Sequence, residues 1–131
     1  MRKTLTGIAV VFICIFMFTG CYSGGTLEER VSDRHLRKME EQLMENSEIN
    51  QTYKEVKIEV SGNHITYKFV FLTYFNDLEI IQAKSYLLNN NYDSQIANYK
   101  DQFEKVFRIR PSLVTFEFYT QDYELLGKVE G

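Results

Sequence analysis

The stretch LEIIQAKSYLLNNNYDSQIANYKDQFEKV, residues 78–106, decides the fold that we predict for this chain. Apolar and aromatic side chains recur in it at steps of three or four residues, which places them along one stripe of an α-helix. We expect one long helix that covers a small sheet, with an interruption at residues 89–91 as the open alternative. The stripe consists of Leu78, Ile81, Ser85, Leu88, Tyr92, Ile96, Tyr99, Phe103 and Val106.

One pair of strands is predicted before this helix in the sequence, and a second pair after it. Apolar and polar residues alternate over 54–60 and again from 64 to about 74, and Ser61-Gly62-Asn63 between them favours a hairpin turn. A second pair is expected at 114–119 and 125–129. With a helix over residues 26–44, the order is α-β-β-α-β-β. The predicted fold class is therefore α+β, with a small antiparallel sheet of three to four strands packed by the long helix.

The amino-terminal end has the order of an export signal. Arg2 and Lys3 precede an apolar run at residues 5–18, about 14 residues long. A membrane-spanning helix needs roughly 20 residues, so we expect removal of the segment and not a permanent span.

The end of that run resembles the lipobox of bacterial lipoprotein precursors, over Phe18-Thr19-Gly20-Cys21. The resemblance implies cleavage between Gly20 and Cys21 and attachment to the Cys21 thiol of diacylglycerol, whose two acyl chains, such as palmitate, would form the anchor. It divides the chain into a signal peptide (1–20), a lipidated tether (21–26) and a single α+β domain (27–131). An ordinary secretory signal that ends beside a cysteine is the alternative.

Cysteine count and charge agree with an anchored, extracytoplasmic protein. Cys14 would leave with the signal, so Cys21 would be the only cysteine of the mature chain, which then has no internal disulfide. Removing Arg2 and Lys3 leaves 13 basic and 18 acidic residues, a net charge of −5. That acidity argues against nucleic acid as a partner. The short tether favours a protein partner close to the membrane.

The mature chain is also similar to small uncharacterised lipoproteins of Gram-positive bacteria that carry a domain of unknown function. The similarity rests on Cys21, the first hairpin, the helix and the aromatic strand 116–119. It implies no catalytic residue.

The residues themselves predict no catalytic or metal site and no cofactor. The mature chain has two histidines, His35 and His64, in different predicted elements, which is not the spacing of a metal site. Ser32, Asp33 and His35 contain the residue types of a hydrolase triad. They are neighbours on one predicted helix, however, whereas a triad joins distant segments. We therefore predict that the protein is not an enzyme.

Tyrosines give the remaining functional signal, since tyrosine is favoured where a surface is both apolar and wet. We predict a partner surface at Val70, Leu72, Tyr74 and Tyr119, on the sheet face away from the helix. The predicted function is a non-enzymatic interaction module at the extracytoplasmic face of the cell membrane. Capture of a small apolar ligand or antimicrobial peptide, between sheet and helix, is the alternative. The sequence does not specify the partner, the oligomeric state or the strand order.

Overall fold

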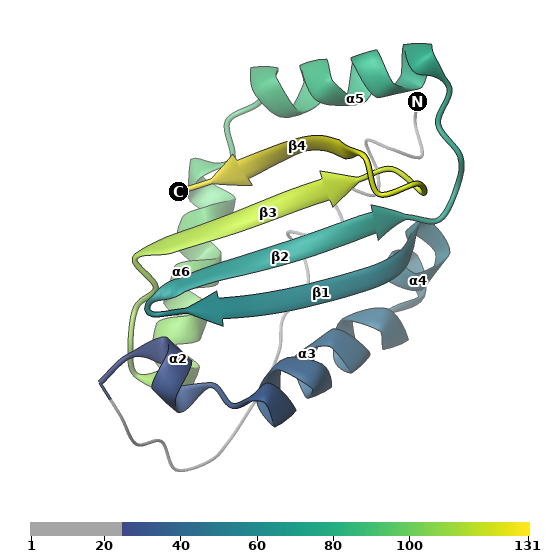
Figure 1. The fold of residues 1–131 in the computed structure, drawn as a ribbon. Helices are drawn as coiled ribbons and strands as arrows, with labels where there is room; N and C mark the ends of the chain where they lie inside the picture. Colours follow the sequence, from purple (N-terminus) through teal and green to yellow (C-terminus); the bar gives the residue numbers. More distant parts are fainter. Residues whose placement is uncertain (1–24) are drawn as a thin grey trace.

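The computed structural model describes residues 25–131, which form one four-stranded sheet surrounded by helices (Figure 1). No helix in this part of the chain is long and apolar enough to cross a membrane. The strands are β1 (Tyr53–Ser61), β2 (His64–Phe71), β3 (Leu113–Tyr119) and β4 (Leu125–Glu130). The helices are α2 (Leu27–Arg30), α3 (Asp33–Glu45), α4 (Ser47–Thr52), α5 (Asp77–Asn89) and α6 (Asp93–Phe107).

The predicted α+β class, the element order and the two hairpins are confirmed, but the sheet is mixed and not antiparallel throughout. The strand order is β1-β2-β3-β4, and the central pair, β2 and β3, is parallel, with Tyr67 opposite Phe116. The reason is the connection between these strands. Helices α5 and α6 return the chain from the end of β2 to the beginning of β3, so both strands run the same way.

The helical region over residues 78–106 is interrupted, which confirms the alternative prediction, and the prediction of a single long helix is wrong. Helix α5 ends at Asn89, and Asn90 has the extended backbone angles φ −108° and ψ 147°. The Asn91 side chain then accepts a hydrogen bond from the Asp93 amide at 2.8 Å, where α6 begins. Asparagine favours such breaks because its side chain competes for backbone hydrogen bonds.

The break changes which side chains face the sheet. In α6 the predicted stripe is buried at Ile96, Tyr99 and Phe103 and partly buried at Val106, and Tyr92, just before the helix, is buried too. In α5 it is not, because Leu78, Ile81 and Leu88 are 62%, 63% and 84% exposed. Ala83 and Leu87 are the buried residues of α5 instead.

The amino-terminal helical region is also divided, into α2, α3 and α4 instead of one helix over 26–44. Ser32 separates α2 from α3, since its side chain accepts a hydrogen bond from the His35 amide and caps α3. Asn46 does the same for α4 by accepting from the amides of Glu48 and Ile49.

The main core lies between the sheet and α6. Aromatic rings stack across the parallel pair, with Tyr67 and Phe116 at 5.0 Å and Phe69 and Phe118 at 5.6 Å between centroids. Tyr99 of α6 meets Phe116 edge to face at 4.9 Å. All five rings are at most 2% exposed. Close aromatic contacts of this kind stabilise the layer beyond their buried area.

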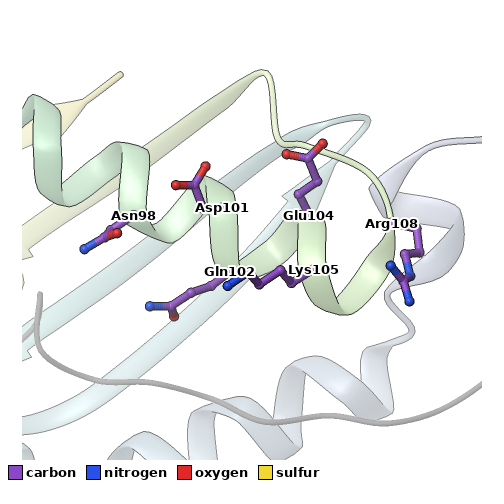
Figure 2. A pocket seen from close by; sticks show the side chains of 6 residues that line it. All are labelled: Asn98, Asp101, Gln102, Glu104, Lys105 and Arg108. Atoms are coloured by element: carbon purple, nitrogen blue, oxygen red, sulfur yellow. The ribbon is translucent and has the colours of Figure 1, made fainter.

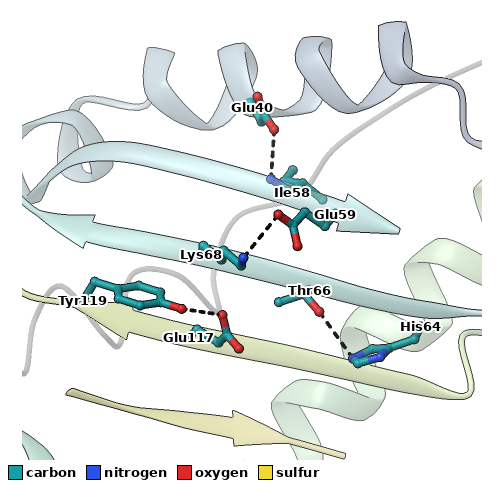
Figure 3. Close-up of polar contacts among 8 residues, drawn as sticks. All are labelled: Glu40, Ile58, Glu59, His64, Thr66, Lys68, Glu117 and Tyr119. Atoms are coloured by element: carbon teal, nitrogen blue, oxygen red, sulfur yellow. Dashed lines mark hydrogen bonds and ion pairs between the residues drawn. The ribbon is translucent and has the colours of Figure 1, made fainter. Parts of the chain in front are cut away.

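Helices also lie along both outer strands (Figure 1). At β1, Glu40 of α3 accepts a hydrogen bond from the Ile58 amide at 2.8 Å, as Figure 3 shows. At β4, Leu87 of α5 comes so close that a Cβ on Gly127 would lie 3.0 Å from its Cδ1. Covered edges hinder the addition of a further strand. The sheet face opposite α6 carries no helix among residues 25–131, and we call it the open face (Figure 1).

The contact at the β1 edge gives a first prediction. Replacing Glu40 by Ala leaves the Ile58 amide without its charged acceptor, and we expect the free energy of unfolding to fall by about 1–2 kcal/mol. The matched variant Glu41→Ala, at an exposed neighbour, should change it by less than about 0.5 kcal/mol. Urea unfolding measures both. Equal losses in the two variants would mean that Glu40 does not hold this edge.

Candidate functional site

The strand register aligns the side chains of the open face in three rows across the sheet. The first row is mostly basic, the second carries two threonines between acidic ends, and the third is mostly apolar. The lysine row is Lys57, Lys68, Glu117 and Lys128; the threonine row is Glu59, Thr66, Thr115 and Glu130; the tyrosine row is Glu55, Val70, Tyr119 and Leu125.

The threonine row belongs to a hydrogen-bonded chain that includes His64. The Thr115 hydroxyl donates to Glu130 Oε2 at 3.2 Å and lies 2.9 Å from His64 Nε2. Because the only hydroxyl proton of Thr115 goes to Glu130, Thr115 accepts from His64, which places a proton on Nε2. Thr66 Oγ1 approaches the same nitrogen at 3.3 Å (Figure 3). The chain joins β2, β3 and β4 and fixes the orientation of the imidazole.

The geometry of these hydrogen bonds fits a structural role and not a catalytic one. Thr115 is only 3% exposed, so its hydroxyl does not face solvent. A nucleophile would give its proton to a base and meet a substrate, whereas this hydroxyl accepts from the imidazole and donates to a carboxylate.

The lysine row offers charges to solvent. Lys68 pairs with Glu59 at 3.2 Å, and their side chains are 34% and 60% exposed (Figure 3). Lys128 lies 3.6 Å from Glu130. Exposed pairs of this kind contribute little to stability. They do space the charges regularly over a rigid surface.

The structure places the four predicted partner residues near one end of the open face, in different environments. Val70 and Tyr119 are register partners, but Val70 is only 4% exposed. Strand β2 ends at Phe71, so Leu72 and Tyr74 lie in the loop beyond it and not in the strand, where they are 41% and 69% exposed.

The Tyr119 ring is half-buried, and its hydroxyl donates to Glu117 Oε1 at 2.8 Å (Figure 3). Burial, together with this hydrogen bond, raises the pKa of Tyr119 to about 12. The phenol therefore stays protonated at neutral pH and keeps the Glu117 carboxylate oriented.

The turn between β3 and β4 partly covers the end of the open face where the tyrosine row lies. Tyr123 donates to Glu55 Oε2 at 2.9 Å, and Lys54 Nζ lies 4.5 Å from the centre of the Tyr123 ring. Gln121 also donates to the Leu72 carbonyl at 3.0 Å. These contacts link the turn to β1 and to the loop after β2, so residues 120–124 fold over this end of the sheet. Tyr123 remains 58% exposed on it.

The first described residues lie beside the β1–β2 turn, at the end of the sheet opposite the tyrosine row. The Leu27 amide donates to Asn63 Oδ1 at 2.9 Å, and the Glu28 amide donates to the Gly62 carbonyl at 2.9 Å. Leu27 is fully buried. The predicted lipidation residue Cys21 and the preceding Gly20 lie outside residues 25–131. The chain that leads from them is thus fixed to the β1–β2 turn from Leu27 onward.

The other sequence candidates have structural roles. His35 Nδ1 lies 3.0 Å from the Ser32 hydroxyl, within the cap of α3. Between residues 25 and 131 no three His, Cys, Asp or Glu side chains are grouped as metal ligands.

A shallow pocket lies along the outer side of α6 (Figure 2). Its two acidic residues, Asp101 and Glu104, already pair with Arg110. The described lining residues come from α6 and from Arg108 just after it, and Figure 2 shows that their side chains do not converge on one point. They are Asn98, Asp101, Gln102, Glu104, Lys105 and Arg108.

Sequence reasoning missed the network of His64, Thr115 and Glu130. Alternation placed His64 and Thr115 on the polar side of their strands, whereas Glu130 lies just beyond the strand predicted at 125–129. What was missing was the register, because Thr115 is 51 residues from His64 and becomes its neighbour through the parallel pairing.

Comparison of the chain with family models, with curated proteins and with solved structures finds no match in any of the three.

Proposed function

We propose that this protein is a lipid-anchored extracytoplasmic lipoprotein that acts as a non-enzymatic interaction module and binds a protein partner close to the membrane. Cys21 carries the anchor, and the open face is the recognition surface.

The open face is the observation that carries this proposal. It spans all four strands, and contacts on the face hold the side chains of Lys68, Lys128 and Glu117, which lowers the entropy that they lose on binding. The lysine row offers cations to carboxylates of a partner. Tyr119 and Leu125 of the tyrosine row, with Tyr123 of the adjoining turn, combine aromatic and apolar surface with hydroxyl groups, and aromatic residues of this kind are enriched at interface centres.

The position of the first described residues supports a partner near the membrane. Cys21 is four residues from Gly25, and a fully extended chain of that length reaches about 14 Å. The β1–β2 turn therefore stays near the bilayer. The strands lead away from it for about 25 Å, so the open face meets proteins in or beside the membrane.

Ligand or peptide capture remains the alternative prediction. It requires space between the sheet and the central helix. Tyr99 of α6 lies 5.7 Å from the Tyr67 ring and 4.9 Å from the Phe116 ring, in direct contact. A ligand at this point would have to displace aromatic rings, which favours the interaction module.

The anchor is tested by replacing Cys21 with Ser. We expect the parent chain to incorporate an alkyne fatty acid and to sediment with membranes, because two acyl chains hold a protein durably. Cys21→Ser should lose both properties. Cys14→Ser is the matched control, since this cysteine lies in the segment that would be removed, and it should behave as the parent does. Labelled, membrane-bound Cys21→Ser protein would contradict the anchor.

The recognition surface is tested by photocrosslinking in cells, with a photoreactive residue at Leu125. We expect one protein to be captured. Replacing both Lys57 and Lys128 with Glu should reduce the adduct about tenfold, since a loss of roughly 1.4 kcal/mol in binding has that effect. The control replaces Lys38 and Lys105, exposed on α3 and α6, with Glu. If the control reduces the adduct equally, or neither pair does, the open face is not the recognition surface.

A further inference from the structure

Helix α5 is apolar on two sides. On the inner side, Ala83 and Leu87 are buried against β4. The other side carries Leu78, Ile81, Ser85 and Leu88, which we call the outer stripe. At 100° per residue, the two sides point roughly 150° apart. The three large residues of the outer stripe are 62%, 63% and 84% exposed, so their side chains have no packing partner among residues 25–131. Ser85 accepts a hydrogen bond from Asn89 of the same helix at 3.0 Å.

The spacing of the outer stripe is that of a helix-pairing seam. Its members follow at steps of three, four and three residues, the a and d positions of a heptad. The helix that presents them is well fixed. Its first turn has a capping box between Asn76 and Glu79, and its inner side packs on the sheet.

We propose that the outer stripe pairs with the outer stripe of a second copy of this protein, in a parallel two-helix contact between two molecules anchored in the same membrane. The proposal rests on the anchoring at Cys21 that is proposed above.

The anchoring membrane itself is not the occupant of the stripe. Gly25 precedes the residues that are bonded to the β1–β2 turn, whereas α5 lies outside β4 at the other edge (Figure 1). Four strands are about 14 Å wide, and a helix adds about 10 Å. The outer stripe faces away from that edge. A tether of about 14 Å does not allow the bilayer that holds Cys21 to contact it.

Charge favours parallel over antiparallel pairing. Asp77 and Lys84 flank the stripe on one side, and Gln82 and Asn89 flank it on the other. In a parallel pair, Asp77 lies beside Gln82 of the second copy, and Lys84 lies beside its Asn89. No like charges are then brought together, and Lys84 keeps its ion pair with Glu124 of its own molecule, 4.0 Å away. In an antiparallel pair, Lys84 would face Lys84 of the second copy, and like charges oppose binding.

Anchoring favours the same arrangement. Helix α5 runs along the strand direction (Figure 1), so a two-fold axis parallel to α5 brings both β1–β2 turns to the same end of the dimer. Both tethers then enter one bilayer. Three large side chains from each copy form a small contact, which is weak in solution. Confinement to one membrane raises the effective concentration and compensates for that size.

The test is disulfide crosslinking of the full chain in membranes. The mature protein has no other free thiol once Cys21 is acylated, so one introduced cysteine reports one position. Parallel pairing brings Ser85 next to Ser85 and Leu88 next to Leu88 of the second copy. With mild oxidation, Ser85→Cys and Leu88→Cys should each give a species of doubled apparent mass that reduction removes. Lys105→Cys, exposed on α6, is the control and should give none.

Two further variants keep the outcome decisive. Adding Ile81→Glu to Ser85→Cys should abolish the doubled species, while photocrosslinking from Leu125 on the open face continues and shows that the fold is intact. A doubled species only when Leu78→Cys and Leu88→Cys are combined would overturn the parallel arrangement. Its absence from the single variants and from the combined variant, in correctly anchored protein, would overturn the dimer itself. Fatty-acid labelling of the same samples reports separately whether the anchor is present.

Discussion

The parallel pairing of β2 with β3 is the constraint on which the rest of the structure depends. Tyr67 and Phe116 stack across it with ring planes 18° apart, and Phe69 and Phe118 stack beside them at 19°. Parallel strands require a crossover, and here the crossover is α5 and α6. Helix α6 covers the aromatic rings, while α5 runs along β4. The crossover thus covers one face and one edge and leaves the other face to solvent.

The arrangement determines how the protein can bind a partner. Helix α3 occupies the β1 edge through Glu40, and α5 occupies the β4 edge through Leu87. Partner strands therefore find both edges covered, and recognition falls to side chains: the rows of the open face and the outer stripe of α5. The β1–β2 turn, where Leu27 is fixed, gives these two surfaces a defined direction relative to the proposed anchor.

Local patterns predicted much of the fold from sequence. Alternation identified β1, β2 and β3, and a predicted turn after β3 added β4. Gly62 supplies the predicted turn between β1 and β2 with φ at 59°. Long-range arrangement was harder. The step from Leu88 to Tyr92 kept the helical phase in the sequence, but Asn90 turns the chain, so the two halves of the stripe face different ways. The turn around Tyr123 also reaches Glu55, the register partner of Val70, and no pattern near Val70 indicates this contact.

The candidate site was predictable only in part, for the same reason. The polar side of each strand was visible, but the rows depend on the register between β2 and β3. Nothing local to His64 shows that Thr115 is its neighbour. Exposure of Leu78 and Ile81 likewise follows from where α5 lies, and not from its own periodicity.

The parallel central pair is tested most directly by nuclear Overhauser contacts between the backbones of β2 and β3 in an isotopically labelled chain. The parallel register predicts contacts that advance together along both strands, from Ile65 with Val114, through Tyr67 with Phe116, to Phe69 with Phe118. Contacts that run in opposite directions, with Ile65 near Phe118 and Phe69 near Val114, would contradict it. They would also remove the open face as it is described.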